Sequence, residues 1–333
     1  NAEIANAIRI SSFTFLLSPI RSFLNLMYLA DFKFFLKNVY GVMEDAVKLI
    51  IIFFLFFTFN SIRIDNIFFA VVASQIISFF IMIPSAYKIW KISYSDYPSE
   101  KIPLFSMLLK NGKWGILSTY MNNFGQNVRL WIVKFMLGTE AVALFSFAFT
   151  LFGHTMSLVA ISNILNPIFS KLKDDTSKFI KLIDKSIKYQ FIAYVGLLIV
   201  ALTTFPTIID YFFPNYHDSL FLFKILMIAI IPASFANIFT PLFYALNAQK
   251  SLFNSIMIKN FFIALFSVIF IYFFGILGVA IEYLATVTVY SFERYRKLKK
   301  IIPNFSISIK DFFTIDIHDR VIMDSILKKF KFF

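Results

Sequence analysis

Long apolar segments separated by short polar ones dominate this chain of 333 residues. The hydrocarbon core of a bilayer is about 30 Å thick, and an α-helix crosses it with roughly 20 apolar residues. On this basis the sequence predicts an all-α fold, a polytopic transmembrane helical bundle with about nine spans. The spans are predicted at residues 4–29, 39–59, 67–90, 114–137, 140–164, 187–205, 220–246, 252–274 and 276–292.

The composition supports a membrane protein. Hydrophobic residues make up 59% of the chain, 47 residues are Phe, and the mean hydropathy is +0.75, which exceeds what a water-soluble core of this length can bury. The absence of Cys excludes disulfides, thiolate zinc sites and a cysteine nucleophile. Asp316, His318 and Asp319 have the residue types of metal ligands, but they lie in a charged tail with nothing to orient them. No metal and no cofactor is predicted.

The basic residues indicate an orientation in the membrane. Of the 32 Lys and Arg, 24 lie in or beside alternate gaps and in the C-terminal tail, whereas only Arg63 and Lys134 lie at the opposite ends of the spans. Since Lys and Arg stay on the cytoplasmic side of inserted helices, the C-terminus is predicted inside and residue 1 outside. The net charge of +13 then reflects orientation. Nucleic-acid binding would need one continuous basic face and is not predicted.

Two features predict the domain organisation. Residues 92–113, rich in Pro, Ser and Tyr, look like a cytoplasmic linker and lobe start after three spans and before six. An echo between residues 28–33 and 244–250 suggests a parallel repeat of the kind transporters use. We expect residues 1–91 to be the second half of an N-terminal six-helix lobe and residues 114–300 a C-terminal six-helix lobe. Residues 301–333 are predicted to form a cytoplasmic amphipathic tail on anionic lipid.

The start of the chain leads to an expectation about its completeness. Residue 1 is predicted to face outward, yet no charged segment followed by an apolar run marks an export signal. The first lobe is therefore expected to be incomplete, with about three further helices before residue 1.

Several helix-end turns together carry a family resemblance. They are residues 137–142 (LGTEAV), 166–172 (NPIFSKL), 212–216 (FFPNY), 242–250 and 275–280 (GILGVA). In their order and spacing along residues 20–300, the chain resembles the bacterial polysaccharide, or O-antigen-type, flippases of the multidrug/oligosaccharidyl-lipid/polysaccharide superfamily. Ala143 and Phe145 stand where that family often has Gly and Tyr, and Pro214 stands where Gly is usual.

The resemblance implies a fold and a function. It implies two six-helix lobes across a central cavity, in the bacterial cytoplasmic membrane, that carry lipid-linked oligosaccharide from the cytoplasmic to the outer leaflet without enzymatic chemistry. Membrane lipids, a coupling ion (H⁺ or Na⁺) and polysaccharide assembly proteins are further expected partners. A multidrug or metabolite exporter of the same superfamily is one alternative, and would predict unpaired acids in the cavity. A membrane sugar polymerase or glycosyltransferase is another, but no loop is large enough for its acid and base residues.

Six basic residues fall inside the predicted spans, where each costs about 2.5 to 3.5 kcal/mol on insertion scales. Lys48 is expected to pair with Glu44 one turn away, and Lys224 and Lys259 are expected to extend toward the membrane surface. The remaining three are Arg9, Arg21 and Arg129. Since acids are few within the spans, at least one arginine is expected to have no acidic partner. A guanidinium binds phosphate oxygens in bidentate fashion, so spare arginines would suit a pyrophosphate-linked lipid.

A polar stripe marks the segment that contains Arg129. Thr119, Asn122, Asn123, Gln126 and Arg129 recur at steps of three and four residues, which places them along one side of a helix. Hydrogen bonding between helices would explain the same stripe and stays open as an alternative. Arg9 and Arg21 would face different directions unless Pro19 alters the winding of their helix. The predicted substrate-binding residues are Arg129, Gln126, Asn122, Asn123, Arg9 and Arg21.

Overall fold

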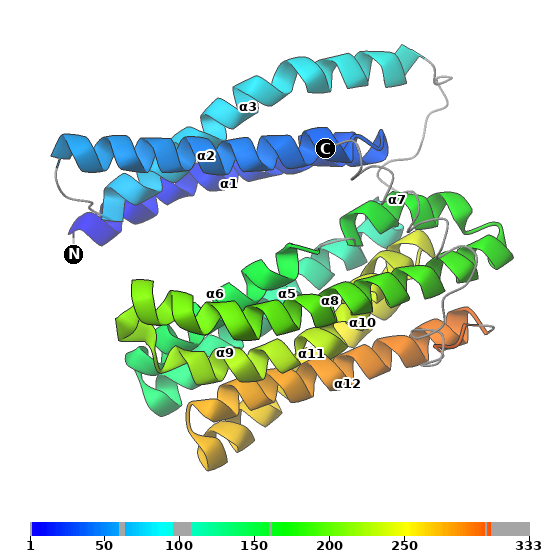
Figure 1. Ribbon diagram of the computed structural model, residues 1–333. Coiled ribbons are helices and arrows are strands. Elements are labelled where there is room, and N and C mark those ends of the chain that lie inside the picture. The colour runs from blue at the N-terminus through cyan, green and yellow to red at the C-terminus, as the bar shows by residue number, and fades with distance from the viewer. Residues whose placement is uncertain (1, 60–63, 96–107, 160–161, 304, 308–333) are drawn as a thin grey trace. The chain divides into compact units, whose positions relative to one another are not determined.

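The computed structural model describes residues 2–59, 64–95, 108–159, 162–303 and 305–307 (Figure 1). The chain divides into two compact units, residues 1–102 and 103–333. The first contains α1 (Ala2–Ala30), α2 (Phe34–Phe59) and α3 (Ile64–Ser95). The second contains η1 (Leu108–Gly112), α5 (Lys113–Leu137), α6 (Thr139–Ser157), α7 (Ser162–Leu172), α8 (Thr176–Phe212), η2 (Pro214–Tyr216), α9 (Ser219–Ile228), α10 (Ile230–Ala245), α11 (Gln249–Phe274) and α12 (Leu277–Ile301).

The predicted all-α class is confirmed, and every predicted span overlaps a helix. Three helical segments are long and apolar enough to cross a membrane by length and composition: Asp65–Lys91, Thr176–Phe212 and Gln249–Phe274. The pair α9 and α10, bent by 53°, makes a fourth if it counts as one span. The other predicted spans lie on helices that are less apolar or more charged. In α2, for example, Glu44, Asp45 and Lys48 lie close together.

The structure differs from the predicted spans at three places. The predicted span 140–164 ends early, because α6 stops at Ser157 and α7 is a separate helix. Span 220–246 is broken at Ala229, between α9 and α10. The basic gap before residue 187 is helical, since α8 begins at Thr176. Most of the predicted tail, residues 308–333, and most of the predicted linker, residues 96–107, lie outside the described part of the chain.

Asp175 explains why α8 begins so early. Its carboxylate accepts a hydrogen bond from the backbone N–H of Lys178 at 3.2 Å and pairs with the Lys178 Nζ at 2.8 Å. An Asp at this position satisfies a backbone donor that the first helical turn leaves without a partner. The hydrogen bonds from Lys178 lower the pKa of Asp175 to about 2.

In the first unit, hydroxyl groups join α1, α2 and α3. The Tyr28 hydroxyl donates to the carbonyl oxygen of Met82 at 3.1 Å and shares a short hydrogen bond with Ser85. Tyr40 of α2 bonds to the same Ser85 hydroxyl at 2.8 Å. Because lipid offers no hydrogen-bond partners, polar groups between membrane helices must satisfy one another. The surrounding core consists of Leu24, Tyr28, Met82, Ala86 and Ile89.

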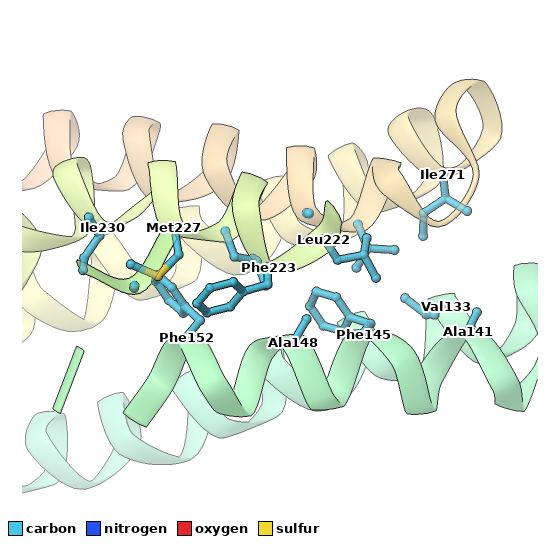
Figure 2. Close-up of a cluster of buried hydrophobic side chains, with 14 of the residues drawn as sticks. Val133, Ala141, Phe145, Ala148, Phe152, Leu222, Phe223, Met227, Ile230 and Ile271 are labelled. Atoms are coloured by element: carbon cyan, nitrogen blue, oxygen red, sulfur yellow. The ribbon is translucent and has the colours of Figure 1, made fainter. Parts of the chain in front are cut away.

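The second unit has two apolar cores. In the first, Phe145 and Phe152 of α6 point toward Phe223 and Met227 of α9 (Figure 2). The second includes Phe169, Phe179, Phe239, Phe243 and Phe305. These large side chains are completely or almost completely buried. They hold together the helices that carry the polar residues described below.

A glycine allows α5 and α11 to approach closely. A Cβ atom added at Gly125 would overlap the side chain of Asn260 on α11. Asn260 in turn donates from Nδ2 to the carbonyl oxygen of Met121 at 2.6 Å. Small residues at such crossings are typical of packed membrane helices.

Candidate anion-binding site

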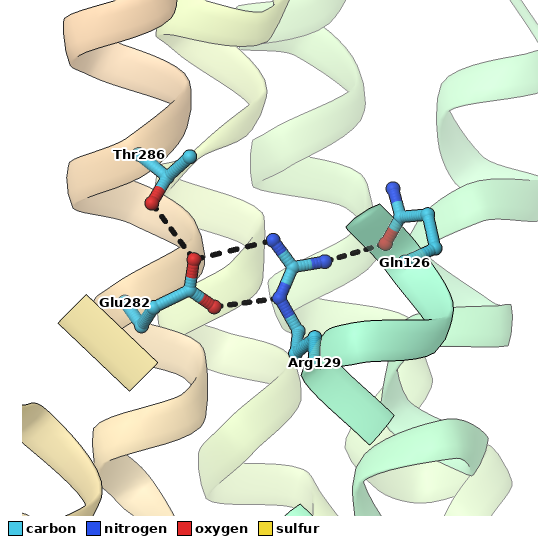
Figure 3. A network of polar contacts seen from close by, with 4 residues as sticks. All are labelled: Gln126, Arg129, Glu282 and Thr286. Carbon is cyan, nitrogen blue, oxygen red and sulfur yellow. Dashed lines mark hydrogen bonds and ion pairs between the residues drawn. The ribbon is translucent and has the colours of Figure 1, made fainter. Parts of the chain in front are cut away.

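A closed polar network joins α5 to α12 (Figure 3). The Nε atom of Arg129 donates to Glu282 Oε2 at 2.6 Å, and Nη2 donates to Oε1 at 3.3 Å. Nη1 donates to the Gln126 amide oxygen at 2.5 Å, and the Thr286 hydroxyl donates to Glu282 Oε1 at 2.7 Å. The side chains of Arg129 and Glu282 are 2% and 0% exposed. The ion pair is therefore buried, bidentate and held on both sides.

This network corrects one expectation. At least one of Arg9, Arg21 and Arg129 was expected to have no acidic partner, and Arg129 is not that residue because Glu282 pairs with it. Gln126 lies on the same side of α5 as Arg129, as the stripe predicted. The sequence held a signal for the pairing, since both residues lie toward the ends of their helices that were predicted to face outward. The ring of Tyr283, 5.1 Å from the guanidinium carbon, adds a cation–π contact.

A second buried cation lies between α5, α11 and α12. Lys259 is 7% exposed, and its ammonium donates to the Asn122 side-chain oxygen. The same Nζ lies 5.5 Å from the ring centroid of Tyr290 on α12. The expectation that Lys259 extends to the membrane surface is therefore wrong, whereas Lys224 is exposed. Asn122, a residue of the predicted polar stripe, thus accepts a hydrogen bond from the Lys259 ammonium.

Arg294 is also buried and also lies over the ring of Tyr290. It is 2% exposed, and its guanidinium carbon lies 3.9 Å from the Tyr290 centroid. Its Nη1 donates to the Ala236 carbonyl oxygen at 2.7 Å and to the Thr240 hydroxyl at 2.5 Å. The sequence reasoning missed Arg294 because it grouped this residue with the basic tail. Its spacing from the buried Val287, Ser291 and Leu298 indicates an inward-facing position.

The charges of this region do not balance. Among the residues that the structure describes, neither Lys259 nor Arg294 has a carboxylate within 4 Å. The nearby Glu293 pairs instead with Arg296 at 2.8 Å and Lys297 at 3.4 Å. Glu282 is already bound by Arg129. Since an uncompensated charge is costly in a low-dielectric interior, these two cations favour an anionic ligand.

The other predicted site residues have different surroundings. Asn123, like Thr119, is exposed on the surface of α5. Arg9 and Arg21 belong to the first unit, where Arg9 is exposed and Arg21 pairs with Glu44 at 2.5 Å. The expected pairing of Lys48 with Glu44 is wrong, because Lys48 pairs with Asp45 at 2.6 Å.

Comparison with known proteins gives the class of this fold. The chain has the fold of the transporters of the MOP superfamily. An outward-facing multidrug resistance MATE transporter is 14% identical with a TM-score of 0.66, and 81% of this chain covers 63% of that protein. The MATE transporter VcmN of Vibrio cholerae in its bent form is 15% identical with a TM-score of 0.68, and 86% of this chain covers 67% of that protein. The lipid II flippase MurJ in its inward closed conformation is 16% identical with a TM-score of 0.65, and 97% of this chain covers 68% of that protein.

The sequence gives the family. The family described as polysaccharide biosynthesis protein matches residues 1–219, and the chain belongs to it. No curated protein sequence matches the chain. The chain spans 63% of the length of the first MATE structure, so it corresponds to part of that fold. It is a multi-pass helical membrane protein.

Proposed function

We propose that the protein flips a lipid-linked oligosaccharide, with a pyrophosphate between lipid and sugar, from the cytoplasmic to the outer leaflet of the bacterial cytoplasmic membrane. The observation that carries this proposal is the pair of buried cations without carboxylates, Lys259 and Arg294. A pyrophosphate supplies the missing negative charge, and a guanidinium fits its oxygens in bidentate fashion. Membership in a polysaccharide biosynthesis family supports a glycan-bearing lipid as the cargo.

The same charges argue against the exporter alternative. A carrier of organic cations needs buried carboxylates that are free to pair with its substrate. In the described part of the second unit, the buried carboxylates Glu282 and Glu293 both bind basic side chains. The proposed activity is therefore transport of an anion, with no covalent chemistry.

The proposed contacts follow the polar stripe of α5. Asn123 is exposed at the surface of the helix and would contact the sugar. Asn122 lies beside Lys259 and would contact the pyrophosphate. Gln126 and Arg129 would follow deeper in the unit. Arg9 and Arg21 are proposed as contacts from the first unit. The proposed coupling ion is H⁺ or Na⁺.

A flipping assay tests the function. The protein expressed from its complete gene would be placed in vesicles with a polyprenyl diphosphate that carries a fluorescent oligosaccharide. We expect a membrane-impermeant quencher added outside to reach the inner-leaflet probe much faster than in empty vesicles. A matched probe whose sugar is joined to the lipid without phosphate should not move. Transport of ethidium with no flipping of the diphosphate probe would contradict the proposal and support an exporter.

The orientation has its own test. We propose that residues 171–188 and the C-terminus are cytoplasmic and that residues 206–219 face outward. The chain has no Cys, and Ser177 and Asn215 are exposed, so single cysteines can report each side. In intact cells a membrane-impermeant thiol reagent should label Asn215→Cys, and should label Ser177→Cys only after permeabilisation. The reverse pattern would show the opposite orientation.

A further inference from the structure

Two groups of buried charged residues lie at different positions along the helices of the second unit. The inner group is Lys259 and Arg294, which both lie near the ring of Tyr290. The outer group is Arg129 and Glu282 with their hydrogen-bond partners. Glu282 and Arg294 lie on the same helix, and their positions differ by about 18 Å at 1.5 Å per residue. In the proposed orientation the inner group is nearer to the cytoplasm.

The two groups differ in net charge. The inner group has two cations and no carboxylate, whereas the single cation of the outer group is neutralised by Glu282. A pyrophosphate is thus attracted strongly at the inner depth and weakly at the outer depth. A transport path needs this property, because a ligand must bind well enough to enter and weakly enough to leave.

The geometry of Glu282 suits it to imitate the substrate. Its two oxygens accept from Nε and Nη2 of Arg129, the same two-point contact that a guanidinium makes with a phosphate. Thr286, one turn further along α12, holds the carboxylate in place. A phosphate that reaches Arg129 must displace an anion that is already positioned.

We infer that Glu282 is a built-in competitor that keeps the pyrophosphate of the transported lipid from binding tightly to Arg129, so that the headgroup is released on the outer side. This inference rests on the proposed function. Glu282 acts through Arg129 and does not itself contact the substrate, so it is a positioning residue. Its removal should strengthen binding and slow transport, which is the opposite of what loss of a binding residue would do.

The decisive variant is Glu282→Gln, which keeps the shape of the side chain and removes its charge. Glu293→Gln is the matched control, because Glu293 is a buried carboxylate on the same helix that pairs outside this network. Binding of polyprenyl diphosphate and flipping of the fluorescent probe would be measured on the complete protein. For Glu282→Gln we expect about tenfold tighter binding and about tenfold slower flipping at saturating probe. For Glu293→Gln we expect neither change.

A double variant separates release from folding. Arg129→Gln with Glu282→Gln removes both the cation and its competitor, so flipping should recover from the level of Glu282→Gln. If Glu282→Gln does not accumulate, Glu282→Asp replaces it, since a shorter side chain weakens the pair and should shift binding in the same direction. Unchanged or weaker binding in the single variant, or a double variant as slow as the single, would overturn the inference. Absence of binding and flipping in the wild-type protein would overturn the proposed function instead.

Discussion

Lys259→Met is expected to abolish flipping and to weaken binding of polyprenyl diphosphate about 10- to 100-fold. A hydrogen bond to a charged group contributes about 1.5 to 3 kcal/mol, and about 1.4 kcal/mol corresponds to a factor of ten. Methionine has a similar length and fills the space between Asn122 and Tyr290, so the bundle should remain packed. Binding would be measured by titration in detergent and transport by the quenching assay.

The control for this variant lies on α9. Lys224→Met removes an in-span lysine that is exposed, and it should leave binding and flipping unchanged. Lys259→Arg keeps the charge and should retain part of the binding. If Lys259→Met flips the probe at the wild-type rate, the inner group is not the site of headgroup capture.

Arg129→Met is expected to be the most destabilising single substitution in the second unit. It leaves Glu282 fully buried without its cation, and breaking a buried pair on one side costs about 3 to 5 kcal/mol. Combining it with Glu282→Leu removes both charges and should restore most of the thermal stability. Thermal unfolding in detergent would compare the single variant, the double variant and the wild-type protein.

Arg21→Met provides the comparison. Arg21 also pairs with a carboxylate, but its side chain is 37% exposed and that of its partner Glu44 is 10% exposed, so this pair is screened more than the pair of Arg129 and Glu282, at 2% and 0%. Its loss should cost much less stability than loss of Arg129. An Arg129→Met protein as stable as the wild type would mean that the pair contributes little to the fold.

The helices could be predicted from sequence because hydropathy depends on local composition. Every predicted span overlaps a helix, and two of the errors fall where a single residue decides the boundary, at the cap Asp175 and at the break Ala229. Such boundaries depend on side-chain hydrogen bonds and bends that an apolar window does not detect.

The site could be predicted only in part. Spacing along one helix placed Gln126 and Arg129 on the same face, which the structure confirms. The partner Glu282 depends on how α12 is rotated against α5, and no pattern within one helix contains that angle. Lys259 was misjudged because its distance from the helix end was considered and its face was not. It lies among the buried Ser255, Ile256 and Ile263, and this spacing indicates an inward position.

The contact between Gly125 and Asn260 has a mechanical consequence. With no room for a Cβ atom and with Asn260 bonded to the backbone at Met121, α5 and α11 cannot slide past each other without breaking this contact. This contact fixes the position of Arg129 on α5 against Lys259 on α11, whereas Glu282, Tyr290 and Arg294 are carried on α12. We expect a small rotation of α12 against α5 and α11 to change the contacts of both groups at once, because Glu282 and Arg294 lie on the same helix.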